Sequence, residues 1–450
     1  MTSSDVVRVS AIRVRKLFGI YDHDVVLKTK ERLTIIHGPN GVGKTAFLGL
    51  TSSLLGGQYG ELAKTPFEDF WIEFSDGSKA GMSKISSKSN GTREVRFYFE
   101  KSGERHSSLQ TTQELFDPSS VAAQIERGSP YLSQIGPDEC VDRRTDEVIS
   151  ASEVIARYSD TMPEKARNRL LKDLPQLKTL REQIKVHLIE AQRLIRFTAL
   201  RPQYLSRSGL DRPVIDTVQE YSRDLKKRIT DALSRYAKES QRLDQSFPQR
   251  LLRPSEGVHE AGDLSVDFDQ IDKLRYRLTR LGLLDESESG PSPFSLTGEA
   301  RLDPTQQTAL RLYVEDTRAK LSTLEDLAQR LEVLLGNINR KFRNKELRIS
   351  REKGLYALGP NTSETLSLSS LSSGEQHEIV LMYDLLFKVT KSTLVLLDEP
   401  ELSLHVSWQK SFLADLASVI AIVEFDVVLA THSPYIIGDR VDLMVELAAE

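Results

Sequence analysis

Residues 38–45 form a glycine-rich segment that could bind phosphate, and they match the P-loop pattern at every required position. The segment follows a short, apolar, β-branched run at residues 33–37, typical of a buried strand, and precedes a helical pattern from about 44 to 55. Glycine permits backbone conformations that turn successive N–H groups toward phosphate, and the helix N-terminus adds its positive end. The sequence therefore predicts a nucleotide-binding loop made of Gly38, Pro39, Asn40, Gly41, Val42, Gly43, Lys44 and Thr45.

A second segment supplies two adjacent carboxylates. The apolar run Leu394–Leu397 ends in Asp398 and Glu399. With a P-loop in the same chain, Lys44 and Thr45 are expected to contact the outer phosphates and Mg²⁺ respectively. Asp398 then fits a Mg²⁺ ligand, direct or through water, and Glu399 fits the base that polarises the attacking water. A buried strand that ends in acids can also be structural, but the P-loop favours the catalytic interpretation.

Two further strand patterns end beside polar side chains. The run 427–430 leads into Thr431 and His432, and a neutral imidazole there can hydrogen-bond a phosphate. A lone histidine is more often structural, so the strand context carries this interpretation. The run 186–189 leads toward Gln192, so that a glutamine follows a strand; Gln124, on a helical pattern, is a weaker rival for such a position.

Residues 370–376 read Ser-Leu-Ser-Ser-Gly-Glu-Gln and open a helical pattern shortly before the acidic pair. Ordinary N-capping would explain a serine followed three residues later by glutamate.

Together, these motifs resemble the ABC/SMC-like ATPase superfamily, whose signature loop commonly reads LSGGQ or LSSGEQ. The resemblance implies ATP and Mg²⁺ as cofactors and a switch role for His432. It implies in addition a Q-loop role for Gln192, which would reach Mg²⁺ and the attacking water. It also implies that the counterparts of Ser372 and Gly374 bind the γ-phosphate of ATP held by an opposite head. The partner would then be a second copy, in a homodimer or a higher even oligomer. The ATP-binding residues that the signature loop would supply are Ser372, Ser373, Gly374 and Glu375.

The segment after Glu399 departs from the commonest pattern of that superfamily. Many ABC proteins have Leu-Asp here, whereas Leu404 is followed by His405. This looks more like the OLD-type branch and its AAA-family relatives, and the compact form resembles the ATPase subunits of bacterial anti-phage systems, Septu-like and PARIS-like. For His405, contact with a partner head and an ordinary surface role both stay open.

The order of strand and helix patterns predicts an α/β fold. We expect an ABC-type P-loop ATPase head, with a mixed sheet flanked by helices and an antiparallel β layer from residues 70–74 and 93–99. An all-α insertion of charged helices, near 214–243, 271–284 and 305–343, interrupts this head. Residues 121–182 look mostly helical. The expected domains are 1–204, the N-terminal half of the head; 205–345, a helical or short coiled-coil insertion; and 346–450, the C-terminal half.

Composition excludes several classes of protein. The 450 residues carry a net charge of -4, which argues against a chain whose main task is to coat nucleic acid. The one cysteine, Cys140, cannot form an internal disulfide and fits a reducing cytoplasm. No signal peptide or membrane-spanning run is visible, so we expect a cytoplasmic protein without membrane contact. The eight histidines have no metal-ligand spacing and only 18 residues follow His432, so no nuclease centre is expected.

Three functions remain open. The first is an ATP hydrolase whose heads close on ATP and regulate a separately encoded effector, such as a nuclease or toxin, in anti-phage defence. The second is a RecF/SMC-like repair ATPase that clamps DNA through a basic cluster, although a solvated helix end is the favoured interpretation of that cluster. The third, a non-enzymatic scaffold, is disfavoured by the intact Glu399. The basic cluster comprises Arg340, Lys341, Arg343, Lys345, Arg348, Arg351 and Lys353.

Overall fold

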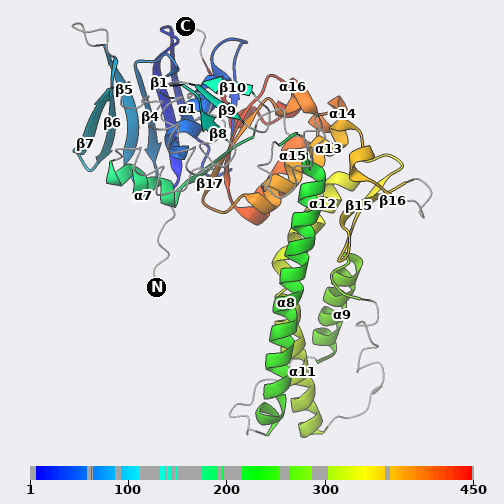
Figure 1. The fold of residues 1–450 in the computed structure, drawn as a ribbon. Helices are drawn as coiled ribbons and strands as arrows, with labels where there is room; N and C mark the ends of the chain where they lie inside the picture. Colours follow the sequence, from blue (N-terminus) through cyan, green and yellow to red (C-terminus); the bar gives the residue numbers. More distant parts are fainter. Residues whose placement is uncertain are drawn as a thin grey trace. The chain divides into compact units, whose positions relative to one another are not determined.

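The structure is a computed structural model, and its residues form two compact units (Figure 1). The first unit comprises Met1–Ala191, Ala199–Leu210 and Val389–Glu450; the second comprises Gln192–Thr198 and Asp211–Lys388. The domains predicted from the sequence, 1–204, 205–345 and 346–450, stay a prediction. The structure describes residues 7–57, 62, 64–86, 93–111, 132–136, 139–142, 147–150, 174–189, 195–196, 215–252, 264–285, 303–359 and 365–447.

A five-stranded sheet forms one layer of the first unit. Its strands, in spatial order, are β11 (Lys185–Ile189), β17 (Thr393–Asp398), β18 (Asp426–Ala430), β3 (Leu33–His37) and β19 (Met444–Glu446). All the pairs described in it are parallel, so the expectation of a mixed sheet is wrong for this layer. The central strands β17, β18 and β3 are almost wholly buried, as strands covered on both faces are, and such sheets are mostly parallel. Strand β19 was not predicted from the sequence.

A six-stranded sheet with only antiparallel pairs forms a second layer, which confirms the expected antiparallel layer. Its strands, in order, are β2 (Tyr21–Val26), β1 (Val9–Leu17), β4 (Asp69–Phe74), β5 (Lys79–Ser86), β6 (Arg93–Lys101) and β7 (Glu104–Thr111). Helix α1 (Lys44–Gly56) shares one hydrophobic core with both sheets, because Phe47 packs in a cluster that contains Ile12 of β1 and Leu396 of β17. The helix that follows the P-loop is thus fixed by burial on two sides.

Part of the expected helical region 121–182 consists of strands. Among its described residues, β8 (Leu132–Gln134), β9 (Glu139–Asp142) and β10 (Glu147–Ser150) form an antiparallel sheet, so the helical expectation is wrong there. Valine and isoleucine in β9 and β10 favour strands, and Cys140 of β9 is fully buried. Helix α7 (Pro175–Gln183) agrees with the expectation.

The remaining elements of the first unit are short, except for one helix that packs in the core. Helix α15 (Phe412–Val423) precedes β18, the strand that the run 427–430 predicted. The short elements are η6 (Pro400–Ser403), α14 (Val406–Gln409), α16 (Pro434–Ile437) and η7 (Val441–Leu443).

The second unit is built around a long helix, α8 (Thr217–Leu251), which lies beside α11 (Pro304–Ser322) over its C-terminal half (Figure 1). Helix α9 (Leu264–Arg280) packs on α11, and α12 (Glu325–Asn339) follows α11. All three expected helical stretches are therefore helical, but the third is two helices that meet at Thr323 and Leu324. No described helix has the length and apolarity to cross a membrane.

The other end of α8 packs against the segment that contains residues 370–376. Here, β14 (Glu346–Ser350), β15 (Gly354–Leu358) and β16 (Thr365–Leu366) form an antiparallel sheet. The short helix η4 (Leu368–Ser370), then α13 (Ser373–Tyr383) and the π-helix η5 (Asp384–Lys388), follow it. The two-residue strands β12 (Ile195–Arg196) and β13 (Ile215–Asp216) pair with each other.

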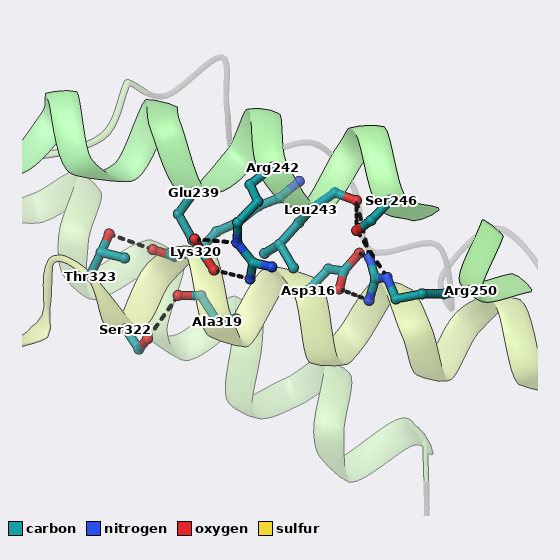
Figure 2. A network of polar contacts seen from close by, with 10 residues as sticks. All are labelled: Glu239, Arg242, Leu243, Ser246, Arg250, Asp316, Ala319, Lys320, Ser322 and Thr323. Carbon is teal, nitrogen blue, oxygen red and sulfur yellow. Dashed lines mark hydrogen bonds and ion pairs between the residues drawn. The ribbon is translucent and has the colours of Figure 1, made fainter. Parts of the chain in front are cut away.

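An ion pair joins the last turn of α8 to α11, as Figure 2 shows. Arg250 donates two hydrogen bonds, of 2.7 and 2.6 Å, to the carboxylate of Asp316, which is 5% exposed. Lys320 donates to Asp244 at 2.6 Å. A carboxylate this buried needs a paired charge, and a bidentate arginine is the strongest side-chain partner for it. The charged side chains of α8 and α11 thus pair with each other, and the two highly charged helices can still pack together along one face.

Candidate nucleotide-binding site

The P-loop connects β3 to α1 through two glycines in the left-handed region. Gly41 has φ 84° and Gly43 has φ 94°. A Cβ atom on Gly43 would lie 2.7 Å from Cδ2 of Leu17, so this position needs glycine both for its φ and for space. The turn leaves Asn40, Gly41 and Thr45 exposed and places the first turn of α1 at the carboxyl end of β3.

Lys44 is 5% exposed and bridges the loop. Its Nζ donates hydrogen bonds to the carbonyl oxygens of Gly38 at 2.8 Å and Pro39 at 3.0 Å, and it lies 3.5 Å from Nδ1 of His432. Burial lowers the pKa of Lys44 below its ordinary value, although the nearby carboxylates, Glu399 first among them, oppose this shift. The two hydrogen bonds to backbone oxygens hold the Lys44 Nζ inside the P-loop, where the sequence predicts its contact with phosphate.

The parallel sheet brings the P-loop, the acidic pair and the histidine to one edge. Asp398 at the end of β17 is level with Ala430 at the end of β18, and Ala430 is level with Ile36 of β3. Because the carboxyl ends of parallel strands meet at the same edge, residues after these three positions converge there. The sequence patterns had predicted each strand separately; the register shows that their ends are aligned.

His432 lies between Lys44 and Glu399. Its Nε2 is 3.6 Å from Oε1 of Glu399, while Nδ1 faces the Lys44 Nζ. Glu399 has φ 43° and ψ 55°, an uncommon conformation for glutamate, and its N–H donates to the carbonyl oxygen of Ala430 at 2.9 Å. Both side chains are about one third exposed, with values of 29% for His432 and 31% for Glu399. This arrangement can present a base and an imidazole to the same bound group.

The oxygen donors fit Mg²⁺. The Thr45 hydroxyl and the Asp398 carboxylate are hard ligands of the kind that this ion takes in phosphate sites. Gln192, the third predicted ligand, lies outside the described residues, as does Gln124; the strand expected before Gln192 is β11, which pairs with β17. Among the described residues there is no cluster of three or more histidine, cysteine, aspartate or glutamate side chains that could hold a metal ion.

The signature segment lies in the second unit, at the start of α13. Ser372 is the N-cap, and its side chain and that of Glu375 form a reciprocal capping box. Lys345 donates to both Glu375 oxygens, at 3.1 and 2.9 Å. Burial alone would raise the pKa of Glu375, but the hydrogen bonds with Lys345 and Ser372 lower it below its ordinary value. Ser372 and Ser373 are exposed and Gly374 is partly exposed, so the first turn of α13 is open to a ligand.

His405 caps a helix. It is the N-cap of α14, and its Nδ1 accepts a hydrogen bond from the N–H of Ser407 at 3.2 Å. The ring is exposed and lies 6.2 Å, between centroids, from that of Trp408. This contact gives His405 a local structural role, and contact with a partner head stays a prediction.

Most members of the basic cluster are engaged with acceptors inside the second unit. The cluster pairs with carboxylates at Lys341–Glu378, Lys345–Glu375, Arg348–Glu346 and Arg351–Asp285. Arg340 donates to the carbonyl oxygen of Gly336 and to Asn337. Arg343 is exposed. The positive charge available to a polyanion is thus smaller than the sequence suggests.

The structure adds side chains that the sequence analysis did not single out. Glu401 contacts both Thr431 and the backbone of His432, and Gln409 contacts Ser433. The sequence contains a hint of these contacts, because an acid, Glu401, follows Glu399 closely and hydroxyl residues flank His432 on both sides. What the sequence lacks is the alignment of β17 with β18, which makes these residues neighbours.

Comparison with known proteins supplies a family. The model of the family described as "AAA domain, putative AbiEii toxin, Type IV TA system" matches residues 156–438, which is more than half of the chain. No curated protein matches the chain.

Solved structures of SMC heads show a weak similarity. An Smc head bound to the C-winged helix domain of ScpA is 9% identical with a TM-score of 0.34, and the alignment covers 98% of this chain and 94% of that one. The SMC head domain from Thermotoga maritima is 10% identical with a TM-score of 0.33, over 98% of this chain and 94% of that one. TM-scores this low do not by themselves establish a shared fold.

Proposed function

The chain belongs to this AAA-domain family, and on that basis we propose that it binds and hydrolyses ATP at the site made by the P-loop, Asp398, Glu399 and His432. One observation carries the proposal: His432 lies 3.5 Å from the Lys44 Nζ and 3.6 Å from the Glu399 carboxylate, at one edge of a parallel sheet. A phosphate-binding amine, a base and a hydrogen-bonding imidazole are the groups that phosphoryl transfer to water needs.

Each residue has a distinct role in this proposal. The P-loop N–H groups and Lys44 bind the phosphates, and Glu399 accepts the proton of the attacking water. The imidazole of His432 hydrogen-bonds the outer phosphate and loses that contact after hydrolysis. Oxygens of Thr45 and Asp398, together with Gln192, would hold Mg²⁺, which neutralises charge on the phosphate oxygens when it is bound.

The proposal includes a second copy of the chain. The exposed N-terminal turn of α13, with Ser372, Ser373 and Gly374, supports it, because a helix N-terminus of this kind is suited to bind an anion. We propose that two chains close head to head on ATP and that closure regulates a separately encoded effector, such as a nuclease or toxin, in anti-phage defence. Lys345 supports this use of the loop by fixing the Glu375 carboxylate that caps it.

The DNA-clamping alternative gains no support from the charges. Ion pairs with carboxylates engage Lys341, Lys345, Arg348 and Arg351 of the basic cluster. To contact DNA phosphates, these side chains would first have to break their ion pairs with carboxylates. The energy lost in breaking them would offset the energy gained from counterion release.

Glu399→Gln tests the proposal. The amide keeps the size of the side chain but cannot accept a proton, so ATP should bind while turnover falls by about 100-fold or more. The variant should then accumulate as an ATP-bound dimer, measured by light scattering after size-exclusion chromatography. Lys44→Ala is the control, because it should bind no ATP and stay monomeric. A Glu399→Gln protein that binds ATP and remains a monomer would contradict the two-head mechanism, and one with full turnover would contradict the role of the base.

A further inference from the structure

The turn that follows Glu399 is tied to the loop that carries His432 by one carboxylate. Oε1 of Glu401 accepts hydrogen bonds from the hydroxyl of Thr431 at 2.8 Å and from the backbone N–H of His432 at 2.7 Å. Thr431 is fully buried. Hydrogen bonds to an ionised carboxylate are roughly twice as strong as neutral ones, so Glu401 fixes the backbone at the position from which the imidazole projects.

Gln409 closes a second connection between the same two segments. Its Nε2 donates to the backbone oxygens of Glu401 at 3.4 Å and Leu404 at 3.3 Å, and its Oε1 accepts from the hydroxyl of Ser433 at 2.7 Å. The N–H of Ser433 in turn donates to the Thr431 hydroxyl at 3.0 Å. Gln409 and Ser433 are 8% and 7% exposed. Hydrogen bonds this buried are costly to leave unmade, so the network resists separation of the two segments.

We propose that Glu401 is a positioning residue that holds His432 beside Glu399, with Gln409 supporting the backbone of Glu401. The inference rests on the proposed ATP hydrolysis. The contact between Glu399 and His432 does not fix its own geometry, because 3.6 Å is too long for a hydrogen bond and both side chains are about one third exposed. Glu401 lies two residues after Glu399, in the turn that begins there. Its hydrogen bond with the His432 N–H therefore connects the backbone of Glu399 to that of His432 through a short segment. A displacement of either group by about 1 Å can cost a large factor in rate.

Glu401→Ala is the first test. Steady-state turnover should fall by about 10- to 100-fold, the range found when partners that orient metal-binding histidines are removed. The dissociation constant of ATP should change less than turnover: no hydrogen bond joins Glu401 to residues 38–45 in the described part of the chain, and its charge acts on Lys44 after those of Glu399 and Asp398. Glu401→Gln should retain most of the turnover, since its amide oxygen can still accept from the His432 N–H and the Thr431 hydroxyl.

A double-mutant cycle separates positioning from general stability. If Glu401 acts through His432, Glu401→Ala should lower kcat in the wild-type background and have no further effect on kcat in His432→Ala. Equal losses in the two backgrounds would overturn the inference, as would a loss that appears only as weaker ATP binding or a lower Tm. Should Glu401→Ala fail to fold, Thr431→Val and Thr431→Ser replace it: valine should lower kcat, and serine, which keeps the hydroxyl, should restore it.

The outcomes distinguish this inference from the proposed function. Absence of ATP turnover in the wild-type protein overturns both. If His432→Ala lowers turnover but neither Glu401→Ala nor Thr431→Val does, the proposed function stands and the positioning role is wrong.

Discussion

Glu399 lies where the strand β17 ends and the turn η6 begins. Its left-handed backbone, with φ 43° and ψ 55°, costs a non-glycine residue of order 1–3 kcal/mol. The hydrogen bond from its N–H to the Ala430 oxygen continues the pairing of β17 with β18, so the chain turns sharply only after the two strands are aligned. This turn places the Glu399 carboxylate at the sheet edge opposite His432. Strain at this position is thus held by the strand pairing on one side and by the contacts of Glu401 on the other.

Gly43→Ala should disable the phosphate loop without a comparable loss of fold. The added Cβ would lie 2.7 Å from Leu17 and would impose strain at φ 94°, so the loop has to move away from the conformation in which its N–H groups converge. We expect the ATP affinity, measured by calorimetry, to fall by about tenfold or more, which corresponds to roughly 1.4 kcal/mol.

Gly49→Ala is the matched control for that substitution. Gly49 lies in the same helix, α1, and a Cβ there meets nothing within 4 Å. Alanine favours a helix interior by about 1 kcal/mol over glycine, so this variant should keep its ATP affinity and melt at the same temperature or higher. Equal ATP affinities in the two variants would show that the conformation of Gly43 does not matter for binding.

Local pattern was sufficient to single out the residues of the candidate site whose types are chemically distinctive, and their roles stay a prediction. Lys44, Asp398, Glu399 and His432 each follow or precede a strand or helix that the sequence reveals by itself, and the structure brings them together. Glu401 was missed because its side-chain partners depend on which strands are neighbours. Glu401 and Thr431 are 30 residues apart in the sequence, and no local pattern of residues indicates a contact over that distance.

At the scale of elements, α13 is continuous with a π-helix that packs on α8. The ring of Tyr383, the last residue of α13, stacks on that of Tyr221 with a centroid distance of 4.5 Å, and both rings lie close to Lys388 of η5. Asp224 of α8 accepts hydrogen bonds from Tyr383 at 2.7 Å, Arg228 at 2.9 Å and Lys388 at 3.0 Å. The Asp224 carboxylate therefore links α8 to the C-terminal end of α13 and to η5.

Asp224→Asn should destabilise the protein in a pH-dependent way. Burial alone would raise the pKa of Asp224, but the hydrogen bonds from Tyr383, Arg228 and Lys388 lower it to about 2, against an ordinary value of 3.8. A carboxylate with a lowered pKa stabilises the fold above its unfolded pKa and loses this effect as the pH falls through the folded pKa. The substitution should cost about 1 kcal/mol at neutral pH, once solvent screening is allowed for, and the difference should disappear between about pH 4 and pH 2.

Urea unfolding of the two proteins at several pH values measures that difference. Asp231→Asn is the matched control, because Asp231 is exposed on the same helix. It should leave the free energy of unfolding unchanged within about 0.5 kcal/mol at every pH. A constant deficit for Asp224→Asn from pH 7 to pH 2 would show that ionisation of Asp224 does not contribute.

The elements themselves were predictable to different degrees for physical reasons. Buried strands such as β3 and β17 are short apolar runs with clear ends, and α8 has a strong helical repeat of buried residues. Strand β19 is three residues long, too short for a periodic signal, and β3 is its one partner among the strands that the structure describes. The break between α11 and α12 at Leu324 was missed because a fully buried leucine continues the apolar repeat through it.

At the scale of the whole molecule, the two halves of the proposed ATP site belong to different compact units. The P-loop, Asp398, Glu399 and His432 lie in the first unit, and Ser372–Glu375 lie in the second. If a signature loop acts only on ATP held by another chain, each of two closed copies contributes one half to each site. The consequence is that two chains, inactive for different reasons, can complement each other.

Mixing Lys44→Ala with Gly374→Asp tests this consequence directly. The first variant lacks the phosphate amine but keeps its signature loop. The second keeps its P-loop but presents a negative charge to the γ-phosphate, while an acid in the first helical turn favours α13 and preserves folding. Each variant alone should show little ATP turnover, and an equimolar mixture should regain a substantial part of the wild-type rate, because the mixed dimer holds one intact site. Turnover that stays at the level of the separate variants, in a mixture shown by light scattering to form dimers with ATP, would indicate that each chain completes its own site. A Gly374→Asp protein with full activity by itself would remove the signature loop from the mechanism altogether.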